Sequence, residues 1–531
     1  MSTATEPEAG ASRGPRRLLG GGGQTLPLLA VALALVAAGV GAIVISTSYD
    51  TPREARLLGP TLAIDDGASN PRDLSANNSP TLVRNPVEQG NLVVVNRIDS
   101  PSYSCSMNVS FDGGGRWTKT PIPAPAGEEP KCYAPDAAFS SDGTLYVTYV
   151  TLKGRANAPN NVWVSRSADG GKTLGDPVKT PLGAHAFQVR LTADPTAPKR
   201  IFLTWLKGGE LGLYAFSRTG NPIMAIRSDD GGVNWTEPAR VSAPSRQRVV
   251  APSPAVGKAR GELNVLYLDL GNDVLDYAGG HRGRGGAPYD GDWRLVLARS
   301  TDNGATWKES VVSEITPMER FIVFTPPFPS IAVDRGSGRV YAAFQDGRDG
   351  DADVWLWSLG SGAADWTGPV RVNDTPKRDG TAQYLPKLSV APNGRLDVLY
   401  YDRRADRTNV LNEVSLQSSF DEGRTFLPRV KVSDRAFSSR IGFGLERNLA
   451  DLGSRLGLLS TDDRAYGVWT DTRGGSLRTA KQDLGRGVVG FNDPPRLSDA
   501  AESALRIGGI ALILLGAGAA IAALAQRRRP A

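Results

Sequence analysis

Three segments of the sequence place an aspartate and, two positions later, an arginine after a run of β-branched and aromatic residues. The segments are RVYAAFQDGR, RLDVLYYDRR and RAYGVWTDTR, with the pairs Asp346 and Arg348, Asp402 and Arg404, and Asp471 and Arg473. An aspartate can act as a general acid or base, and an arginine guanidinium can hold an anion through two parallel hydrogen bonds. The pattern predicts an anion-binding site in which the aspartates are the candidate catalytic residues and the arginines the candidate substrate-binding residues.

The same three pairs also suit a structural role. Each arginine could fix the loop that follows its own strand, or bridge to a neighbouring unit of the fold. A pattern that recurs in three successive units is typical of scaffolding, so the structural alternative is the favoured one. The pairs are nevertheless the best site candidates that the sequence offers.

A second repeat indicates the elements that must position these residues. It is a short polar turn that ends on a large apolar side chain, with the copies SFDGGGRW, SADGGKTL, SDDGGVNW, STDNGATW and SFDEGRTF at 110–117, 167–174, 228–235, 300–307 and 419–426. The copies define a unit of roughly 60 residues, and repeats of this period are typical of propellers and solenoids. Asp and Ser can bond turn amides, Gly can adopt positive φ, and the aromatic ring can pack beneath the turn.

Each unit also contains a segment rich in β-branched and aromatic residues. There are seven such segments, at 91–97, 144–150, 200–206, 262–268, 339–345, 395–401 and 464–470. Shorter strand-like segments flank them, and PPRLSD at 494–499 is interpreted as the closing strand of the last unit. Four strands in each of seven units predict an all-β, seven-bladed β-propeller, with a six-bladed propeller as the alternative if one unit is misassigned.

The repeated turn resembles the Asp box of sialidase-like (BNR-repeat) propellers. In that family the turn joins the third and fourth strands of a blade, so the resemblance implies structural roles for Asp112, Asp169, Asp230, Asp302 and Asp421. The family's substrate site lies on the opposite face of the propeller. The second strands end at that face, so the resemblance implies that the Asp–Arg pairs lie there.

The resemblance is much weaker for the catalytic residues. Sialidases use an arginine triad, a tyrosine–glutamate nucleophile pair and an acid/base aspartate, and the first arginine lies in an (F/Y)RIP motif. Here the matching positions read CYAP (132–135) and QYLP (383–386), with tyrosine in place of arginine, and Arg84 in VRNP lies at the wrong end of its strand.

The resemblance therefore implies a sialidase-like propeller that acts on or binds acidic glycans, with exo-sialidase or glycoside hydrolase activity as its enzymatic form. The alternative is a non-catalytic cell-envelope scaffold, or a propeller that binds a polysaccharide or a protein. Fold alone does not separate these functions, because propellers carry many of them.

Two uncharged apolar runs, 26–45 and 507–525, are each long enough to cross ~30 Å of hydrocarbon as a helix. Three arginines, 527–529, follow the second run and predict a cytoplasmic C-terminus. Two spans then place the tails 1–25 and 526–531 in the cytoplasm and the propeller, 56–500, outside the cell (plasma) membrane.

Two further points concern the apolar runs. A cleaved signal peptide is the alternative for the first run, although its apolar core is longer than is usual. Small residues permit close helix packing, so Gly516 and Gly518 are expected to pair with Gly39 and Gly41.

The chain has two cysteines, Cys105 and Cys132, both in the predicted outer domain. In an oxidising compartment they are expected to form one disulfide. The two histidines, His185 and His281, are too few for a three-histidine zinc site. His281 lies in an insertion, 271–292, whose length is typical both of functional loops and of solvated ones.

Three clustered carboxylates, Asp349, Asp351 and Asp353, could bind calcium, but they lack the EF-hand glycine and distal glutamate. A solvated loop is the favoured interpretation, so no metal and no cofactor are predicted. The 61 Lys and Arg residues against 55 Asp and Glu give a net charge of +6 that is scattered along the chain, so nucleic acid is not an expected partner. No pattern in the sequence indicates the oligomeric state.

Overall fold

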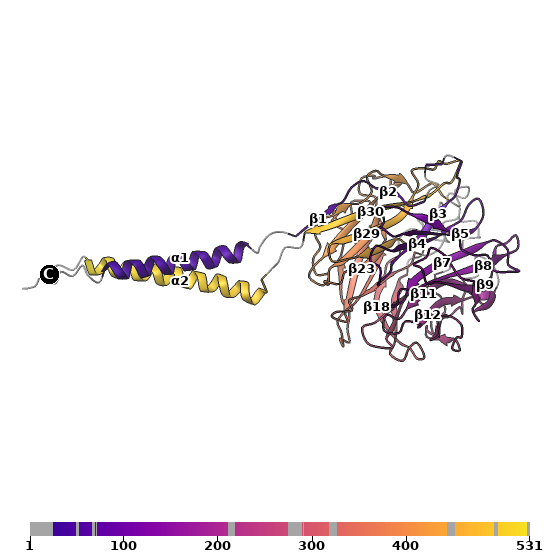
Figure 1. Cartoon of the computed structure of the whole chain (residues 1–531), viewed down its shortest axis with the longest axis horizontal. Helices are drawn as coiled ribbons and strands as arrows, with labels where there is room; N and C mark the ends of the chain where they lie inside the picture. The colour runs from indigo at the N-terminus through magenta and orange to yellow at the C-terminus, as the bar shows by residue number, and fades with distance from the viewer. Residues whose placement is uncertain are drawn as a thin grey trace, which may run out of the picture. The chain divides into compact units, whose positions relative to one another are not determined.

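The computed structural model of the chain describes residues 25–48, 53–65, 69–70, 72–210, 218–273, 289, 291–317, 327–442, 452–492 and 497–527. Backbone contacts divide the chain into two compact units. One consists of Met1–Glu54 with Asn492–Ala531, and the other of Ala55–Phe491. The first unit contains two helices, and the second consists mainly of β-strands, with a short 3-10 helix, η2 (Gly183–His185) (Figure 1).

The helical unit is an antiparallel pair, α1 (Thr25–Ser48) and α2 (Asp499–Arg527). A Cβ atom added at Gly39 would lie 2.6 Å from the carbonyl oxygen of Gly509, and one added at Gly516 would lie 2.7 Å from that of Ala32. The two helix backbones are therefore in direct contact at positions where only glycine fits.

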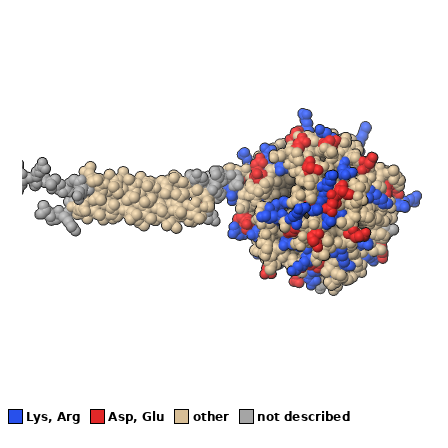
Figure 2. All heavy atoms as spheres, turned by 60° about the horizontal axis from the view of Figure 1, so that its bottom comes forward, with Lys and Arg blue, Asp and Glu red and all other residues tan. Residues whose placement is uncertain are grey.

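Both helices are long and apolar enough to cross a membrane, as the sequence predicts. The visible face of the helix pair carries no charged side chain (Figure 2). A Cβ atom at Gly41 or Gly518 would meet no atom within 4 Å. Gly39 and Gly516 thus lie in the helix contact, but their partners are Gly509 and Ala32 rather than each other, and Gly41 and Gly518 lie outside it, so the expected glycine-to-glycine pairing is wrong.

The β-unit is a propeller of seven four-stranded antiparallel blades (Figure 1). Blade 1 is β3 (Asn77–Arg84), β4 (Leu92–Ile98), β5 (Ser104–Ser110) and β6 (Thr118–Thr120). Blade 2 is β7 (Cys132–Phe139), β8 (Leu145–Lys153), β9 (Ala158–Ser167) and β10 (Val178–Lys179). Blade 3 is β11 (Ala186–Ala193), β12 (Ile201–Lys207), β13 (Ile223–Ser228) and β14 (Ala239–Arg240).

The remaining blades follow in chain order. Blade 4 is β15 (Val249–Val256), β16 (Leu263–Asp269), β17 (Trp293–Ser300) and β18 (Lys308–Ile315). Blade 5 is β19 (Ser330–Val333), β20 (Val340–Asp346), β21 (Asp353–Leu359) and β22 (Thr367–Arg371). Blade 6 is β23 (Gln383–Val390), β24 (Leu396–Asp402), β25 (Leu411–Ser419) and β26 (Val430–Lys431), with β27 (Phe437–Ser438) paired to β25. Blade 7 is β28 (Gly457–Ser460), β29 (Arg464–Asp471), β30 (Asp483–Asn492) and β1 (Glu54–Leu57), with β2 (Leu62–Ala63) paired to β30.

The first strands of the blades form a closed ring. Each contacts the first strand of the next blade, and β28 contacts β3. The seven predicted strand segments are the second strands of the seven blades, and every residue of β4, β16 and β24 is buried. The seven-bladed prediction is confirmed, and the six-bladed alternative is wrong.

Blade 7 joins the two ends of the β-unit. Its first three strands come from the C-terminal part of the chain, but its outer strand is β1, which pairs with β30. Just beyond β1, the Leu58 amide donates to the carbonyl oxygen of Val488 at 2.7 Å. The prediction that 494–499 closes the last blade is wrong, because β1 holds that place and Asp499 begins α2. Pairing between segments so distant in sequence leaves no local pattern to read.

The repeated turns adopt the hydrogen bonds that their residue types predict. In the copy at 300–307, the Ser300 hydroxyl donates to Asp302 at 2.7 Å and accepts from the Gly304 amide at 2.8 Å. Asp302 also accepts from the Thr306 hydroxyl at 2.6 Å and amide at 2.9 Å. These bonds from Thr306 and Ser300 lower the pKa of Asp302 to about 2. The Trp307 ring nitrogen donates to the Gly304 carbonyl at 3.0 Å, which fixes the ring against the turn.

The other four copies share the central contact of this turn. In each, the aspartate accepts a hydrogen bond from the hydroxyl of the serine two positions earlier, and the acceptors are Asp112, Asp169, Asp230 and Asp421. These carboxylates are engaged within their own turns, which join the third strand of a blade to the fourth.

The carboxyl groups of Asp65 and Asp483 lie close together where the segment that follows β2 packs against blade 7. The Leu484 amide donates to Asp65 at 2.6 Å, beside the buried side chain of Asp483. Burial, followed by the negative charge of Asp65, raises the pKa of Asp483 to about 7, although Lys481 lies 3.6 Å away and opposes the shift. Asp73 and Asp471 add further negative charge. Between about pH 4 and pH 7, Asp483 is therefore protonated in the folded propeller and ionised in the unfolded chain.

We predict a pH dependence of stability from this group. Its folded-state pKa lies above the usual aspartate value, so its stabilising effect is complete below about pH 4 and is lost as the pH rises to about 7. Over that window the free energy of unfolding should fall by about 4 kcal/mol more in the wild type than in Asp483→Asn. Chemical denaturation of the propeller at several pH values measures this difference. Parallel pH profiles for the two proteins would contradict it.

A second prediction concerns the helix pair. Gly39→Leu should separate the helices because its side chain meets the Gly509 backbone, whereas Gly41→Leu, the matched control, should not. Spin labels at Leu26→Cys and Gln526→Cys, in full-length protein in detergent, report the distance between the neighbouring helix ends. We expect a short, narrow distance distribution in the control and a longer, broader one in Gly39→Leu. Equal distributions would show that the glycine contact does not hold the pair.

Candidate functional site

The first predicted pair, Asp346 with Arg348, is an ion pair within one loop that also joins two blades. Asp346 is fully buried and accepts from the Arg348 amide at 2.9 Å and from its Nε at 2.8 Å. Arg348 Nη2 also donates to the carbonyl oxygen of Glu314, in the outer strand of blade 4, at 2.9 Å. Burial raises the pKa of Asp346, although the hydrogen bonds and charge of Arg348 oppose the shift.

The second pair is bound in the same way. Arg404 donates through Nε to Asp402 and through Nη1 to Asp374, at 2.6 Å in both cases. Asp402 is fully buried and also accepts from the Ser415 hydroxyl at 2.7 Å and from Arg429 at 3.2 Å.

The third pair follows this pattern in blade 7. Arg473 Nε donates to Asp471 at 2.8 Å, and its Nη1 bonds Asp434 in the connection from blade 6. Across the described parts of the chain, no hydrogen bond or ion pair joins one of the three pairs to another. Their contacts support the structural alternative, in which the arginine ties a second strand to the outer strand of the preceding blade (Arg348) or to the connection from it (Arg404 and Arg473).

A tyrosine–glutamate contact beside an arginine also occurs, as the family resemblance requires, but not at an accessible place. The Tyr267 hydroxyl bonds Glu309, and Arg246 bonds Glu309 at 2.8 Å and Asp269 at 2.7 Å. Tyr267 is fully buried in blade 4, where burial and then Glu309 raise its pKa well above the usual value. A hydroxyl in this position cannot reach a sugar, so this group is an internal brace of blade 4.

The inner strands of the propeller share a backbone irregularity that the sequence patterns did not predict. Five of them contain a register shift, and within each shift lies a residue with positive φ: Ser79, Ala134, Gln188, Ala251 and Leu385. Such bulges re-aim the side chains that follow them. Positive φ is strained for these residue types, so the ring must impose it.

The re-aimed side chains occupy one common register. Six inner strands place a polar residue opposite the fourth residue of the second strand, and these residues are Thr81, Asp136, Arg190, Ser253, Ser330 and Lys387. The first strands surround the propeller axis, so these side chains gather there from different blades. In blade 7, Arg455 precedes β28 and reaches the same group.

We call Thr81, Asp136, Arg190, Lys387 and Arg455 the axial cluster. The Thr81 hydroxyl donates to Asp136 at 2.8 Å, and Arg190 Nε lies 3.3 Å from the same carboxylate. Arg455 donates through Nε to Thr81 at 3.1 Å and through Nη2 to the carbonyl oxygen of Pro135 at 2.7 Å. Blades 1, 2, 3 and 7 are thereby linked around one carboxylate.

The axial cluster has more positive than negative charge. Lys387 makes no hydrogen bond or ion pair with another described residue, and Arg190 Nη1 is buried without a hydrogen-bond partner among them. Burial and then the charge of Arg190 lower the pKa of Lys387 to about 8 and that of Arg455 to about 9, while Asp136 opposes both shifts. At neutral pH three cations therefore face one carboxylate, and such a group attracts anions.

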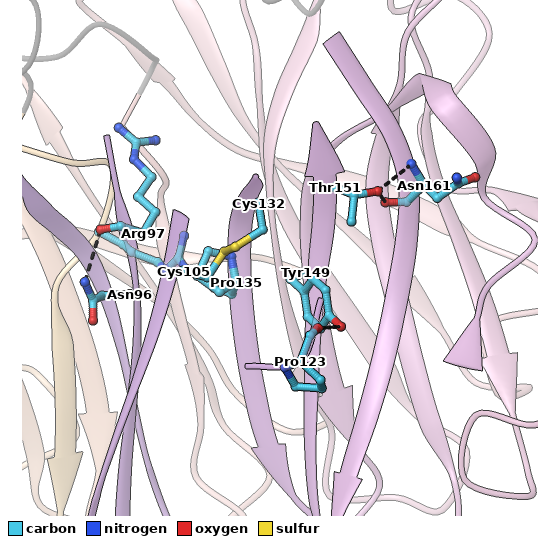
Figure 3. The surroundings of a disulfide bond; sticks show 10 residues. Asn96, Arg97, Cys105, Pro123, Cys132, Pro135, Tyr149, Thr151 and Asn161 are labelled. Atoms are coloured by element: carbon cyan, nitrogen blue, oxygen red, sulfur yellow. Dashed lines mark hydrogen bonds between the residues drawn. A yellow bond between two sulfur atoms is a disulfide. The ribbon is translucent and has the colours of Figure 1, made fainter. Parts of the chain in front are cut away.

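A disulfide braces this part of the ring. Cys105, in the third strand of blade 1, is bonded to Cys132, at the start of the inner strand of blade 2, with an S–S distance of 2.08 Å (Figure 3). Next to it, Arg97 donates to the Tyr133 hydroxyl at 2.9 Å and forms an ion pair with Asp99 at 3.0 Å. The disulfide thus fixes the start of the strand that carries Asp136.

The predicted loop carboxylates make separate contacts. Asp349 pairs with Lys377 at 2.9 Å, Asp351 accepts from the Gly380 amide at 3.0 Å, and Asp353 accepts from Asn373 at 2.6 Å. Within the described ranges, no group of three or more His, Cys, Asp or Glu side chains is placed to hold a metal ion. His281 and most of the 271–292 insertion lie outside the described residues.

No model of a known protein family matches the chain, and no curated protein matches it by sequence. Among solved structures it is similar to a protein of unknown function from Dyadobacter fermentans DSM 18053, with 12% identity and a TM-score of 0.47 over 82% of this chain and 99% of that one. It is also similar to a polysaccharide lyase described as an ulvan lyase (10% identity, TM-score 0.47, 79% of this chain and 97% of that one). A third is the NanB sialidase from Streptococcus pneumoniae (10% identity, TM-score 0.43, 64% and 67%). Similarity at this level assigns no activity, so function rests on the side chains of this chain.

The axial cluster escaped the sequence patterns although a signal was present. Five of the six residues that share the common register follow a proline: Pro80, Pro135, Pro252, Pro329 and Pro386. The motifs CYAP and QYLP belong to this series, and the informative position was the residue after the proline, Asp136 or Lys387, rather than the tyrosine before it.

The structural role of the Asp–Arg pairs predicts that Asp402→Asn lowers the free energy of unfolding by about 3 kcal/mol, because it leaves a buried site without its charge. Asp365→Asn, at an exposed aspartate, is the matched control and should change it by less than about 0.5 kcal/mol. Urea denaturation of the propeller measures both. An Asp402→Asn protein as stable as the control would exclude the structural role.

Proposed function

We propose that this chain is a membrane-anchored propeller that binds acidic glycans outside the cytoplasm, and that the axial cluster is the binding site. The observation that carries the proposal is the charge of the cluster, in which Arg190, Lys387 and Arg455 face the single carboxylate of Asp136. Cations held by several blades cannot move apart to relieve their repulsion, so an anion from solvent is the natural partner.

The arrangement of the guanidinium groups favours a carboxylate as that anion. Arg455 donates through Nε to Thr81 and through Nη2 to Pro135, which fixes the plane of its guanidinium group, and Arg190 Nε forms an ion pair with Asp136. Each keeps further N–H groups without a described acceptor. A planar carboxylate matches such edges through paired, charge-assisted hydrogen bonds, and acidic sugars carry one on a compact ring.

The helix pair supports the membrane anchor. An antiparallel pair returns the chain to the side from which it came, so both termini lie on one side and the propeller on the other. The arginines at 527–529 favour the cytoplasm for the termini and therefore an extracytoplasmic propeller at the cell membrane. The disulfide between Cys105 and Cys132 agrees with an oxidising compartment.

Binding without turnover, in a polysaccharide- or protein-binding scaffold, is the second candidate function. The sequence-predicted catalytic carboxylates Asp346, Asp402 and Asp471 favour it, because each accepts hydrogen bonds from its paired arginine and is not free to act as an acid or base.

Isothermal titration of the full-length protein in detergent tests the binding. Polygalacturonate and hyaluronan should bind, with affinity that falls as salt rises, and neutral dextran should not. Arg190→Ala should weaken binding about tenfold or more, because it removes charge-assisted hydrogen bonds. The exposed Arg335→Ala is the matched control and should bind normally. The proposal fails if dextran binds equally well or if Arg190→Ala binds like the control.

A further inference from the structure

The carboxylate of the axial cluster, Asp136, already binds neighbouring residues of the protein. Asp136 is buried, accepts from the Thr81 hydroxyl at 2.8 Å and from the Leu191 amide at 2.9 Å, and forms an ion pair with Arg190 at 3.3 Å. These contacts engage both oxygens of Asp136 within the protein, where it lies between Thr81, Leu191 and Arg190.

Hydrolysis of a glycosidic bond usually needs two carboxyl groups on either side of the bond, or an activated tyrosine in place of one. Among the six residues that share the common register, Asp136 is the one carboxylate. The Tyr267–Glu309 contact is enclosed in blade 4. The residues of the common register therefore supply one carboxyl group rather than the pair that hydrolysis requires.

The axial cluster contains arginine cations and a lysine amine, which suit a different way of cleaving acidic glycans. In a uronate, the carboxylate sits next to C5, and the leaving oxygen is on C4. Cations on that carboxylate stabilise the negative charge that develops when C5 loses its proton, in the manner of an oxyanion site. Arg190 and Arg455 supply such cations, and Lys387 is an amine without a described partner.

We propose that the axial cluster cleaves 4-linked uronate polysaccharides by β-elimination, with Lys387 as the base and Arg190 and Arg455 holding the uronate carboxylate. This inference rests on the proposed function, because it requires an acidic glycan at the same site. Lys387 is then a catalytic residue, and Asp136 and Thr81 position the arginines.

The step balances without a co-reactant. The Lys387 amine takes the proton from C5, the electrons of the C5–H bond form a double bond between C4 and C5, and the C4–O bond breaks. The departing oxygen takes up a proton, which the new Lys387 ammonium can return. The products are one chain with a new hydroxyl and one that begins with an unsaturated uronate, and the enzyme is restored.

The surroundings of Lys387 favour this role. The charged groups that act on it are Arg190, Asp136 and Arg455, and both arginines favour its neutral form. Its half-buried side chain keeps some contact with solvent. An amine with a pKa of about 8 is partly neutral at mildly alkaline pH, so the elimination rate should rise as the pH passes through that value.

The test uses full-length protein in detergent with polygalacturonate, alginate and hyaluronan as probes. The ultraviolet absorbance of the unsaturated uronate reports elimination, release of reducing ends reports any cleavage, and calorimetry reports binding. Lys387→Arg keeps the positive charge, but its guanidinium group stays protonated at the pH of the assay and therefore cannot accept the C5 proton. It should bind within about threefold of the wild type and lose at least about a hundredfold in elimination rate. Lys308→Ala, at an exposed lysine, is the matched control.

The outcomes separate the two proposals. Unsaturated product from the wild type and Lys308→Ala, but not from Lys387→Arg, supports elimination at Lys387. Reducing ends without unsaturated product, or binding with neither, overturns elimination while the binding function stands. Undiminished elimination by Lys387→Arg overturns the role of Lys387. Absence of binding to every acidic polymer overturns both proposals.

Discussion

Ring closure in blade 7 is the constraint on which the rest of the propeller depends. β1 and β30 come from opposite ends of the β-unit, and their pairing converts an open row of sheets into a ring in which β28 contacts β3. A closed ring leaves no first or last blade with an unpaired face, and it brings seven inner strands around one axis. Closure is held by the backbone pairing of β1 with β30 and by the hydrogen bond from the Leu484 amide to Asp65. The ends of the ring are also the ends that lead to α1 and α2, so the closing blade carries the connections to both helices.

The charges on the axis are a consequence of that closure. Arg190, Lys387 and Arg455 belong to three blades and would be far apart in an open row. The ring brings them together, and the bulges in the inner strands turn the side chains toward one another. Asp136 offsets part of the repulsion through Arg190, and Thr81 links its carboxylate to Arg455. The disulfide fixes the start of the Asp136 strand against blade 1. This arrangement holds three cations around one carboxylate, and we propose that a bound anion offsets their charge.

The sequence predicted those features that depend on local patterns. The second strands are alternating or continuous apolar runs, and turns such as 300–307 follow from residue types within eight positions, so both could be read directly. The outer strand of blade 7 could not, because β1 pairs with a segment at the other end of the chain. The prominent Asp–Arg pairs are ion pairs whose arginines also bond the preceding blade or its connection, and no bond between described residues joins one pair to another. The axial residues gave a weak signal, a polar residue after a proline, since their convergence depends on ring closure rather than on spacing.

Recognition of an acidic sugar at the axis of the propeller is the central proposal. A crystal structure of the protein with a bound uronate oligosaccharide tests it most directly. We predict that the sugar carboxylate lies within hydrogen-bond distance of Arg190 and Arg455, with C5 facing Lys387. An oligosaccharide bound instead at the loops of Arg348, Arg404 or Arg473, with no contact to Arg190, Lys387 or Arg455, would contradict this proposal and assign the function to the loops that follow the second strands.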